Sequence, residues 1–325
     1  MLIAKNLYKS FSVKEGGLFS RKFKTIEAVR DVSIEIPEGK IVGLIGVNGA
    51  EKTTTIKMLS ALLEPTAGSV FIDELDAVTH HIKAKERINL ITGGERSLYW
   101  RLSARENLRY FGSLYNLPTK VLLPRIEELI SLVSLTEFAD VAVEKYSKGM
   151  KQRLQIARGL INDPKYIFLD EPTLGLDVVI ANEFRTHIKM LAKERNKGVL
   201  LTTHYISEAE ELCDYLYIIH DGAIIAQGKV EEIKRRFKTR HEYSLTYESA
   251  TDTQLDILEG KFRTLSARIG KGEEANELIV SAEQDILPDI LDTMRKQGIR
   301  VLSTRTLEAN LEEIVLELLK NQQGA

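Results

Sequence analysis

One short loop carries the residue types that bind phosphate groups. It runs from position 46 to position 54, between the apolar stretch at 41–45 and a helical pattern that continues to Leu59. The loop fits the spacing G-x-x-x-x-G-K-[ST], except that Glu51 stands where the second glycine belongs. In such a loop, backbone amides and a helix N-terminus surround the phosphates of a nucleotide. Lys52 is expected to reach the β- and γ-phosphates, and Thr53 to hold Mg2+.

Glu51 is the feature of this loop that puts ATP binding in question. A glycine before the lysine lets the backbone approach a phosphate, whereas glutamate adds bulk and a negative charge. We therefore expect weaker ATP binding. Two alternatives stay open. A carboxylate is favourable at a helix N-terminus, so Glu51 could settle there and mimic a phosphate in the empty site. It could also point outward and leave ATP binding intact.

A pair of acids follows the apolar run at 166–169. Asp170 and Glu171 close what reads as a buried parallel strand, and ligands of open α/β sheets bind at the edge where such strands end. Asp170 is expected to support Mg2+ through its water shell, and Glu171 to polarise the water that attacks the γ-phosphate. An isolated acid pair of this kind is more often a helix cap or a solvated turn. The phosphate loop upstream favours the catalytic interpretation.

Two further segments place polar groups at the ends of elements. Ser147 and Gly149 open a helical pattern and so predict a second anion-accepting helix N-terminus. The apolar strand at 198–203 ends at His204. A lone histidine at a strand end is ordinarily satisfied by a neighbour, but downstream of Glu171 it is a candidate sensor of the γ-phosphate.

In this order, the motifs resemble the ATP-binding subunit of an ABC transporter, and the resemblance covers about residues 1–230. It implies that 46–54 is the Walker A loop, 147–152 the signature, 166–171 Walker B, 175–177 the D-loop and His204 the switch histidine. In that family two ATP-binding domains pair head to tail, as a homodimer or a heterodimer, and each signature contacts the γ-phosphate held by its partner. Phe11 matches the position of the aromatic residue that stacks on adenine, although it could equally be a core residue.

The residues expected to contact nucleotide or metal are therefore drawn from all of these motifs. The catalytic candidates are Glu171 and His204, the metal ligands are Thr53 and Asp170, and the remaining contacts to ATP are Phe11, Gly46, Asn48, Gly49, Ala50, Glu51, Lys52, Thr54, Glu95, Ser147 and Gly149.

Three positions besides Glu51 depart from the family pattern. The family usually has a glutamine within the segment at 91–100, but this segment has none, so Glu95 is either a substitute oxygen ligand or a solvated loop acid. Lys148 replaces the first glycine of the signature and is expected to place a cation near the partner's phosphates, where it would offset some of the charge of Glu51. Gly175 stands in the D-loop where serine is common.

Composition limits the setting of these motifs. The chain has 325 residues, 43% of them apolar and 28% charged, which is enough for a main core and one further small domain. The formal net charge of -2 gives no sign of nucleic-acid binding, and the single cysteine, Cys213, suits a reducing compartment. No signal peptide or membrane span is recognisable. We expect a cytoplasmic protein held on the inner face of the membrane by a separately encoded permease.

The expected fold has two parts. Residues 1–230 form an α/β P-loop NTPase domain of the ABC type, with a mixed sheet core, an antiparallel N-terminal layer, a hairpin loop at 14–24 and a helical subdomain at about 95–150. Leu98, Tyr99, Trp100 and Leu102 in that subdomain are either core residues or part of the permease groove.

A charged linker at 231–241 leads to a small α+β domain at 242–325. Its β-α-β-β-α-β order predicts a ferredoxin-like sandwich that binds a regulator, dimerises or only covers an apolar face. Its closing segment resembles that of drug- and sodium-exporting branches of the family. We therefore expect an ATP-hydrolysing subunit of an exporter or, because of Glu51, a catalytically impaired partner subunit.

Overall fold

The structure is a computed structural model that describes residues 1–15, 22–92, 98–237, 241–262, 268–271, 276–307 and 311–323. The chain divides into two compact units, Met1–Val230 and Glu231–Ala325. The first contains β1 (Leu2–Glu15), β2 (Lys22–Ile36), β3 (Ile41–Ile45), α1 (Lys52–Leu59), β4 (Ala67–Ile72), β5 (Leu75–Asp76), α2 (His81–Glu86), β6 (Ile88–Thr92), α3 (Ala104–Leu114), α4 (Thr119–Leu132), α5 (Lys148–Gly159), β7 (Tyr166–Asp170), α6 (Val178–Lys193), β8 (Gly198–Thr203), α7 (Ile206–Leu212), β9 (Tyr215–His220) and β10 (Ala223–Gly228).

A six-stranded sheet forms the centre of the first unit, in the order β10-β9-β3-β8-β7-β6. The strands from β9 to β6 run parallel, and β10 pairs antiparallel with β9 at one edge. Every residue of β3 and β8 is buried. Because helices cover both faces of a parallel sheet, such strands are mostly apolar rather than alternating. The expected mixed sheet core is confirmed.

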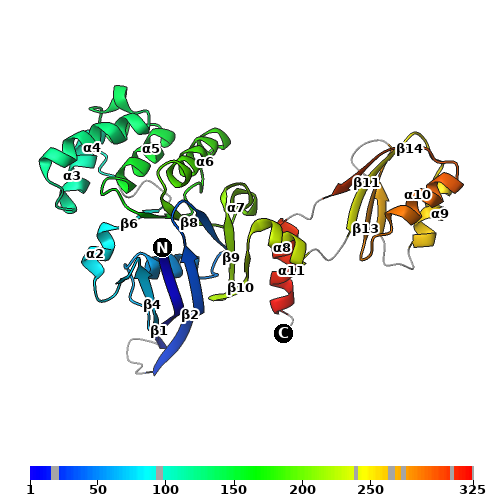
Figure 1. The fold of residues 1–325 in the computed structure, drawn as a ribbon, viewed down its shortest axis with the longest axis horizontal. Helices are drawn as coiled ribbons and strands as arrows, with labels where there is room; N and C mark the ends of the chain where they lie inside the picture. Colours follow the sequence, from blue (N-terminus) through cyan, green and yellow to red (C-terminus); the bar gives the residue numbers. More distant parts are fainter. Residues whose placement is uncertain are drawn as a thin grey trace. The chain divides into compact units, whose positions relative to one another are not determined.

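A second, antiparallel sheet of order β2-β1-β4-β5 forms the N-terminal layer (Figure 1). Its inward side chains join the main core, among them Leu2, Leu7, Ile34 and Ile72. The prediction of a hairpin loop at 14–24 is wrong at both ends, because β1 continues to Glu15 and β2 already begins at Lys22. Cross-strand pairing extends the ladder further than the charged composition suggested, and residues 16–21 lie outside the described part.

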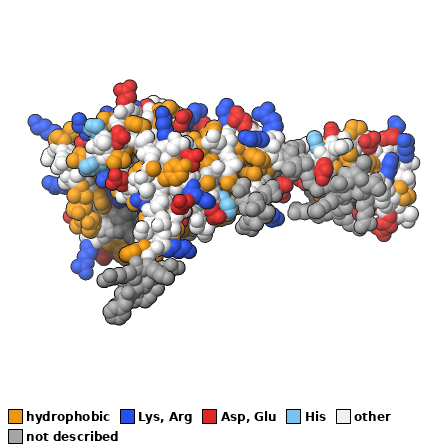
Figure 2. Space-filling model, turned by 90° about the horizontal axis from the view of Figure 1, so that it is seen from below, with side chains coloured by type: hydrophobic (Ala, Val, Ile, Leu, Met, Phe, Trp, Pro, Cys, Tyr) orange, Lys and Arg blue, Asp and Glu red, His pale blue; other side chains and the backbone are white. Residues whose placement is uncertain are grey.

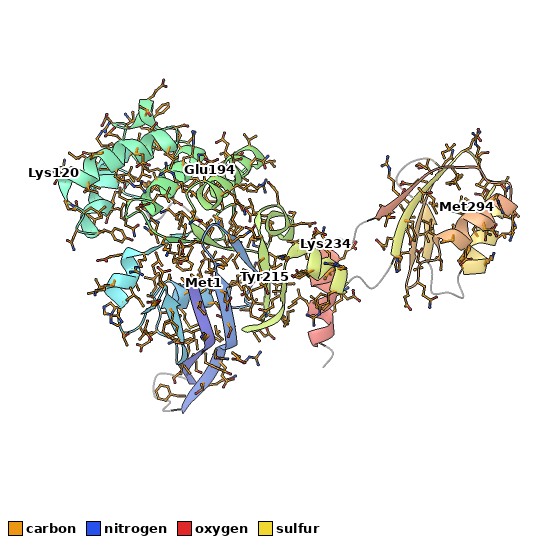
Figure 3. All side chains as sticks on the ribbon, viewed as in Figure 1. Met1, Lys120, Glu194, Tyr215, Lys234 and Met294 are labelled. Carbon is orange, nitrogen blue, oxygen red and sulfur yellow. The ribbon has the colours of Figure 1, made fainter. Side chains whose placement is uncertain are left out.

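The helical subdomain contains α3, α4 and the start of α5, with α3 and α4 at the upper left of Figure 1. Ser103 begins α3 with a reciprocal capping box, since its hydroxyl accepts from the Glu106 amide and Glu106 accepts from the Ser103 amide. Lys120, which lies in α4 of this subdomain, is labelled in Figure 3.

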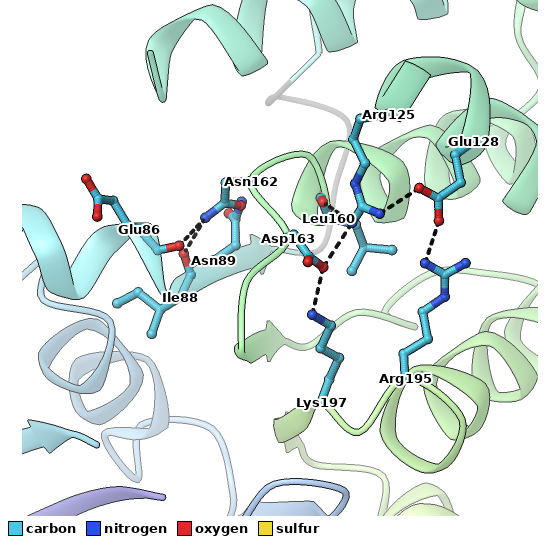
Figure 4. A network of polar contacts seen from close by, with 10 residues as sticks. All are labelled: Glu86, Ile88, Asn89, Arg125, Glu128, Leu160, Asn162, Asp163, Arg195 and Lys197. Carbon is cyan, nitrogen blue, oxygen red and sulfur yellow. Dashed lines mark hydrogen bonds and ion pairs between the residues drawn. The ribbon is translucent and has the colours of Figure 1, made fainter. Parts of the chain in front are cut away.

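Ion pairs attach α4 to the segments beside the central sheet (Figure 4). Arg125 donates to the Leu160 carbonyl at 2.9 Å and to Asp163 at 3.1 Å, and Lys197 also reaches Asp163, at 2.8 Å. Arg195 bridges to Glu128 at 2.7 Å. The side chain of Arg125 is only 14% exposed, whereas its partners Glu128 and Asp163 are exposed, so each ion pair contributes little to stability.

Asp214 fastens the beginning of β3 to the end of α7. Its carboxylate accepts from the Ile41 amide at 2.9 Å and pairs with Lys193 at 2.8 Å and Lys40 at 3.1 Å. Burial alone would raise the pKa of Asp214, but these bonds outweigh it and hold the pKa below its usual value.

We expect Asp214→Asn to lower the free energy of unfolding by about 1–2 kcal/mol at pH 7, because charged hydrogen bonds to Ile41, Lys193 and Lys40 are lost. A depressed folded-state pKa gives stability that is present above the unfolded-state pKa and lost as pH falls through the folded value. The difference between wild type and variant, measured by denaturant unfolding, should therefore shrink below about pH 4. A difference that stays constant from pH 7 to pH 3 would contradict this role.

The second unit contains α8 (Val230–Phe237), β11 (His241–Tyr247), α9 (Asp252–Phe262), β12 (Arg268–Lys271), β13 (Glu277–Ala282), α10 (Leu287–Lys296), β14 (Val301–Leu307) and α11 (Leu311–Gln323). Its sheet has the order β12-β13-β11-β14 and is antiparallel at every pairing. With α9 and α10 as crossovers, this is the predicted ferredoxin-like arrangement. Met294 of α10, labelled in Figure 3, is fully buried in its core.

On the face drawn in Figure 2, basic and acidic side chains are intermixed, with apolar patches between them. Within the described residues, every helix is too short or too polar to cross a bilayer.

Candidate nucleotide-binding site

Strand register brings the predicted motifs to one edge of the central sheet. Ile45, the last residue of β3, pairs with Thr203 of β8, and Thr202 pairs with Asp170 of β7. Parallel strands that end in register release their following segments at the same edge. The phosphate loop, Glu171 and His204 therefore emerge side by side, although they are far apart in the sequence.

The phosphate loop is tightly packed at its start. A Cβ on Gly46 would lie 2.4 Å from the Ile219 carbonyl oxygen, so only glycine fits there. Gly49 has φ +84°, Ala50 is buried, and Asn48 is exposed. The Lys52 side chain is 6% exposed, and its ammonium donates to the Gly46 carbonyl at 2.7 Å and to the Val47 carbonyl at 3.2 Å. The lysine thus closes the loop from inside.

Glu51 occupies a backbone conformation that favours glycine. It has φ 71° and ψ 26°, in the left-handed region. Its carboxylate makes no cap bond to the amides of α1 but accepts a hydrogen bond from the Thr54 hydroxyl at 2.6 Å. The side chain is half-buried and lines the same cavity as Lys52 and Thr53. Position 51 therefore carries both backbone strain and a negative charge toward the site.

Thr53 and Asp170 lie together at the start of α1. The Thr53 hydroxyl is 3.2 Å from one Asp170 oxygen and 3.4 Å from the other. Thr202 donates to Asp170 at 2.6 Å, which fixes the orientation of the carboxylate. A hydroxyl and an oriented carboxylate are the oxygen ligands that Mg2+ prefers, and this pair fits a magnesium ion held through one or two protein oxygens and water.

Glu171 lies between Lys52 and His204 and contacts both of them. One carboxylate oxygen is 3.4 Å from the Lys52 ammonium, and the other is 2.6 Å from His204 Nδ1. Glu171 has φ 49°, and its amide donates to the Thr202 carbonyl at 3.1 Å. This sharp turn after β7 aims the carboxylate into the site. The predicted base and the predicted switch histidine are thus in direct contact.

These groups surround a cavity of about 340 Å³. Its lining residues are Asn48, Gly49, Glu51, Lys52, Thr53, Glu171, Leu174 and His204. The cavity thus joins residues of the loop, the acid pair and the strand-end histidine in one hollow.

Ser147 and Gly149 belong to a neighbouring structure and do not line this cavity. Ser147 caps α5 by accepting from the Met150 amide at 3.2 Å. Gly149 is buried against α6, where a Cβ would lie 3.0 Å from Ile180. Lys148 donates from its ammonium to the Gly175 carbonyl of the same chain. In the single chain this lysine is therefore engaged by its own D-loop.

The remaining predicted positions differ in how far they are exposed. Phe11 is 39% exposed on β1, which rules out the alternative that it is a core residue, and the Lys9 ammonium lies 5.4 Å from its ring centre. Glu95 lies outside the described residues. Tyr99 and Trp100 are about half exposed, whereas Leu98 is buried, so this cluster divides between surface and core.

The sequence interpretation missed three polar residues behind the site. Thr202 orients Asp170, and Gln152 donates to the Pro172 carbonyl at 2.9 Å. Glu208 of α7 is 2% exposed, and burial raises its pKa. Their signal was a polar side chain at a position that turns out to be buried: a hydroxyl, an amide and a carboxyl.

The fold and the cavity define a P-loop nucleotide-binding domain with an acid and a histidine placed for phosphate chemistry. Residues 29–174 match the family model for ABC transporters. The chain is 43% identical over 215 residues to the ABC transporter ATP-binding protein NatA of Bacillus subtilis, covering 66% of this chain and 87% of NatA. It is 29% identical to ABC transporter A family member 8 of Arabidopsis thaliana, covering 98% of this chain but only 35% of that protein.

Among solved structures, a dimeric post-hydrolysis state of the ATP-binding cassette MJ0796 with ADP and Pi superposes with a TM-score of 0.61. It is 26% identical, and the match covers 71% of this chain and 99% of the cassette. This chain belongs to the ATP-binding subunits of ABC transporters, which are ATPases.

Proposed function

We propose that the protein is the energy-coupling ATPase of an ABC exporter and drives a separately encoded membrane permease. The observation that carries this proposal is the position of Glu171, in contact with Lys52 and His204 and facing the cavity of the phosphate loop. A base near a phosphate cradle, held by a histidine, is the arrangement that hydrolysis of a γ-phosphate needs.

In this proposal each residue around the cavity has a separate role. Lys52 leaves its pairing with Glu171 and binds the β- and γ-phosphates, so that ATP binding itself frees the carboxylate. Glu171 then accepts a proton from the attacking water, while His204 keeps the carboxylate oriented and contacts the γ-phosphate. Catalysis of this kind depends on positioning and charge stabilisation more than on covalent chemistry.

Mg2+ would be held by Thr53, with Asp170 supporting it. When bound, the ion neutralises charge on the phosphate oxygens. Thr202 contributes by keeping the Asp170 carboxylate turned toward Thr53. The Thr53 hydroxyl lies 3.2 Å from the nearer Asp170 oxygen.

Ser147 and Gly149 complete the proposal through a second copy. The capped N-terminus of α5 presents amides suited to an anion, yet it lies outside the cavity of its own chain. A head-to-tail dimer, either of this chain or with a close relative, would place it over ATP bound to the partner. The dimeric cassette with ADP and Pi supports this arrangement.

The permease would dock on the helical subdomain. Tyr99, Trp100 and Tyr110 are exposed there, and the Tyr99 and Tyr110 rings meet edge to face at 4.8 Å. Exposed aromatic residues on a rigid support are typical of partner sites. This contact would hold the protein at the cytoplasmic face of the membrane. The export direction rests on the likeness of the closing segment to exporting branches of the family.

The test is steady-state hydrolysis of MgATP by the purified chain, with Lys52→Ala as the inactive control. We expect turnover in the wild type, dependent on Mg2+, and loss of turnover in the variant. Turnover that survives Lys52→Ala would point to a contaminating ATPase and contradict the assignment.

A second candidate is favoured by Glu51 alone. Its charge lines the cavity and its backbone is strained, so the chain could serve as a nucleotide-sensing or structural subunit paired with an active relative. That role predicts no turnover in the wild type and turnover in Glu51→Gly.

A further inference from the structure

Lys148 at the start of α5 and Gly175 in the loop after β7 meet in space. In the structure the Lys148 ammonium donates to the Gly175 carbonyl. Gly175 has φ +72°, and a Cβ there would lie 3.3 Å from the Lys148 nitrogen. Gly175 therefore supplies both the backbone conformation and the space that the Lys148 side chain uses.

Other contacts hold the same loop against α5. Gln152, one turn further along the helix, donates to the Pro172 carbonyl at 2.9 Å in a buried position. Gly149 packs on Ile180 of α6, where an added Cβ would come within 3.0 Å. The first two turns of α5 thus contact the beginning of the loop, its middle and the helix that follows it.

The contact between Lys148 and the Gly175 carbonyl also offsets an unfavourable position of the lysine charge at the start of α5. Lys148 is the first residue of α5, where the helix dipole disfavours a cation. A carbonyl oxygen that accepts from the ammonium offsets this disadvantage, and hydrogen bonds to charged groups are stronger than neutral ones. A glycine at position 148 would need no such acceptor.

The loop itself depends on few bonds of its own. The Leu174 amide donates to the Glu171 carbonyl at 3.2 Å, and the Leu176 amide donates to the Thr173 carbonyl at 3.0 Å. These two turns begin at Glu171 and end at Leu176, directly before Asp177, which caps α6. A restraint on Gly175 therefore also restrains the backbone that carries Glu171.

We propose that Lys148 is a positioning residue that pins the D-loop to the signature helix within one chain, so that the two segments and the Glu171 backbone move as one unit. The effect of this role on catalysis rests on the proposed function, whereas the contact between Lys148 and Gly175 does not. It replaces the expectation that Lys148 acts as a cation on the partner's phosphates.

The contact is tested by hydrogen exchange in the nucleotide-free full chain. In Lys148→Met, which removes the donor and keeps the length, amides of 173–177 should exchange at least about fivefold faster. Lys148→Arg should restore protection, since a guanidinium can donate to the same carbonyl. Lys145→Met is the matched control, because it removes a nearby exposed lysine just before Ser147. It should leave the loop unchanged.

The effect on catalysis is tested by the split between kcat and ATP binding. Lys148 does not line the nucleotide cavity, so binding of ATP to the single chain should be equal in wild type and Lys148→Met. We expect kcat to fall about fivefold in Lys148→Met and to return in Lys148→Arg. Gly175→Ser should be more harmful with Lys148 present than in Lys148→Gly, which would show that the two positions are coupled.

The outcomes separate this inference from the proposed function. Equal exchange of the 173–177 amides in wild type and Lys148→Met, or an equal kcat with altered exchange, would overturn the positioning role while leaving the ATPase assignment intact. A wild type without turnover would contradict the proposed function, and the exchange experiment would still decide whether Lys148 pins the loop.

Discussion

Replacing Glu171 with glutamine should reduce kcat by about 10²–10⁴-fold, which is the range for losing a general base. The amide has nearly the same shape as the carboxylate but accepts no proton from water. ATP binding should remain, because the phosphate loop, Thr53 and Asp170 are unchanged. The measurement is single-turnover hydrolysis beside equilibrium binding of a fluorescent ATP analogue.

Glu183→Gln provides a matched control, since Glu183 is an exposed acid on α6. It should retain wild-type turnover. If Glu171→Gln hydrolyses ATP at a rate within a few-fold of wild type, then Glu171 is not the general base. Its contact with His204 would then be structural only.

Replacing Glu51 with glycine should tighten ATP binding by at least about tenfold. Two unit charges about 5 Å apart repel by roughly 3 kcal/mol at an effective dielectric constant of ~20, before screening by salt. The same change relieves a left-handed conformation at φ 71°. We expect the free energy of unfolding to rise by about 1 kcal/mol, after allowing for the greater chain entropy of glycine. Isothermal titration and denaturant unfolding give the two quantities.

Glu51→Gln separates the charge from the backbone. It removes the negative charge but keeps a side chain in the left-handed conformation, so it should recover much of the ATP affinity and none of the stability. If Glu51→Gly and wild type bind ATP equally, the charge has no influence on the ligand, despite the position of the side chain on the cavity wall.

Much of the fold could be predicted because its signals are local. The apolar run at 166–169 that ends in Asp170 and Glu171 indicated a buried parallel strand, and the register of the sheet places Lys52, Glu171 and His204 together. The C-terminal order of strands and helices likewise specified the ferredoxin-like sheet. These features depend on periodicity and on chain order, which a sequence displays directly.

The parts that escaped prediction depend on contacts between distant residues. The hairpin strands extend to Glu15 and from Lys22 because cross-strand pairing outweighs their charged composition. The acceptor of Lys148 is a backbone carbonyl, which no residue type reveals. Thr202 looked like a strand residue, and only the neighbouring strand makes its hydroxyl a partner of Asp170. Neither the left-handed conformation of Glu51 nor its bond to Thr54 was predicted.

The central claim is that two chains form one ATP site from the loop of one and the signature of the other. Lys52→Ala disables the loop, and Ser147→Arg disables the signature, so each variant alone should be inactive. Mixed in equal amounts, they should recover about a quarter of wild-type ATPase activity, because half of the dimers are mixed and each carries one intact site. A mixture that stays as inactive as its components, under conditions in which the wild type hydrolyses ATP, would contradict the head-to-tail arrangement.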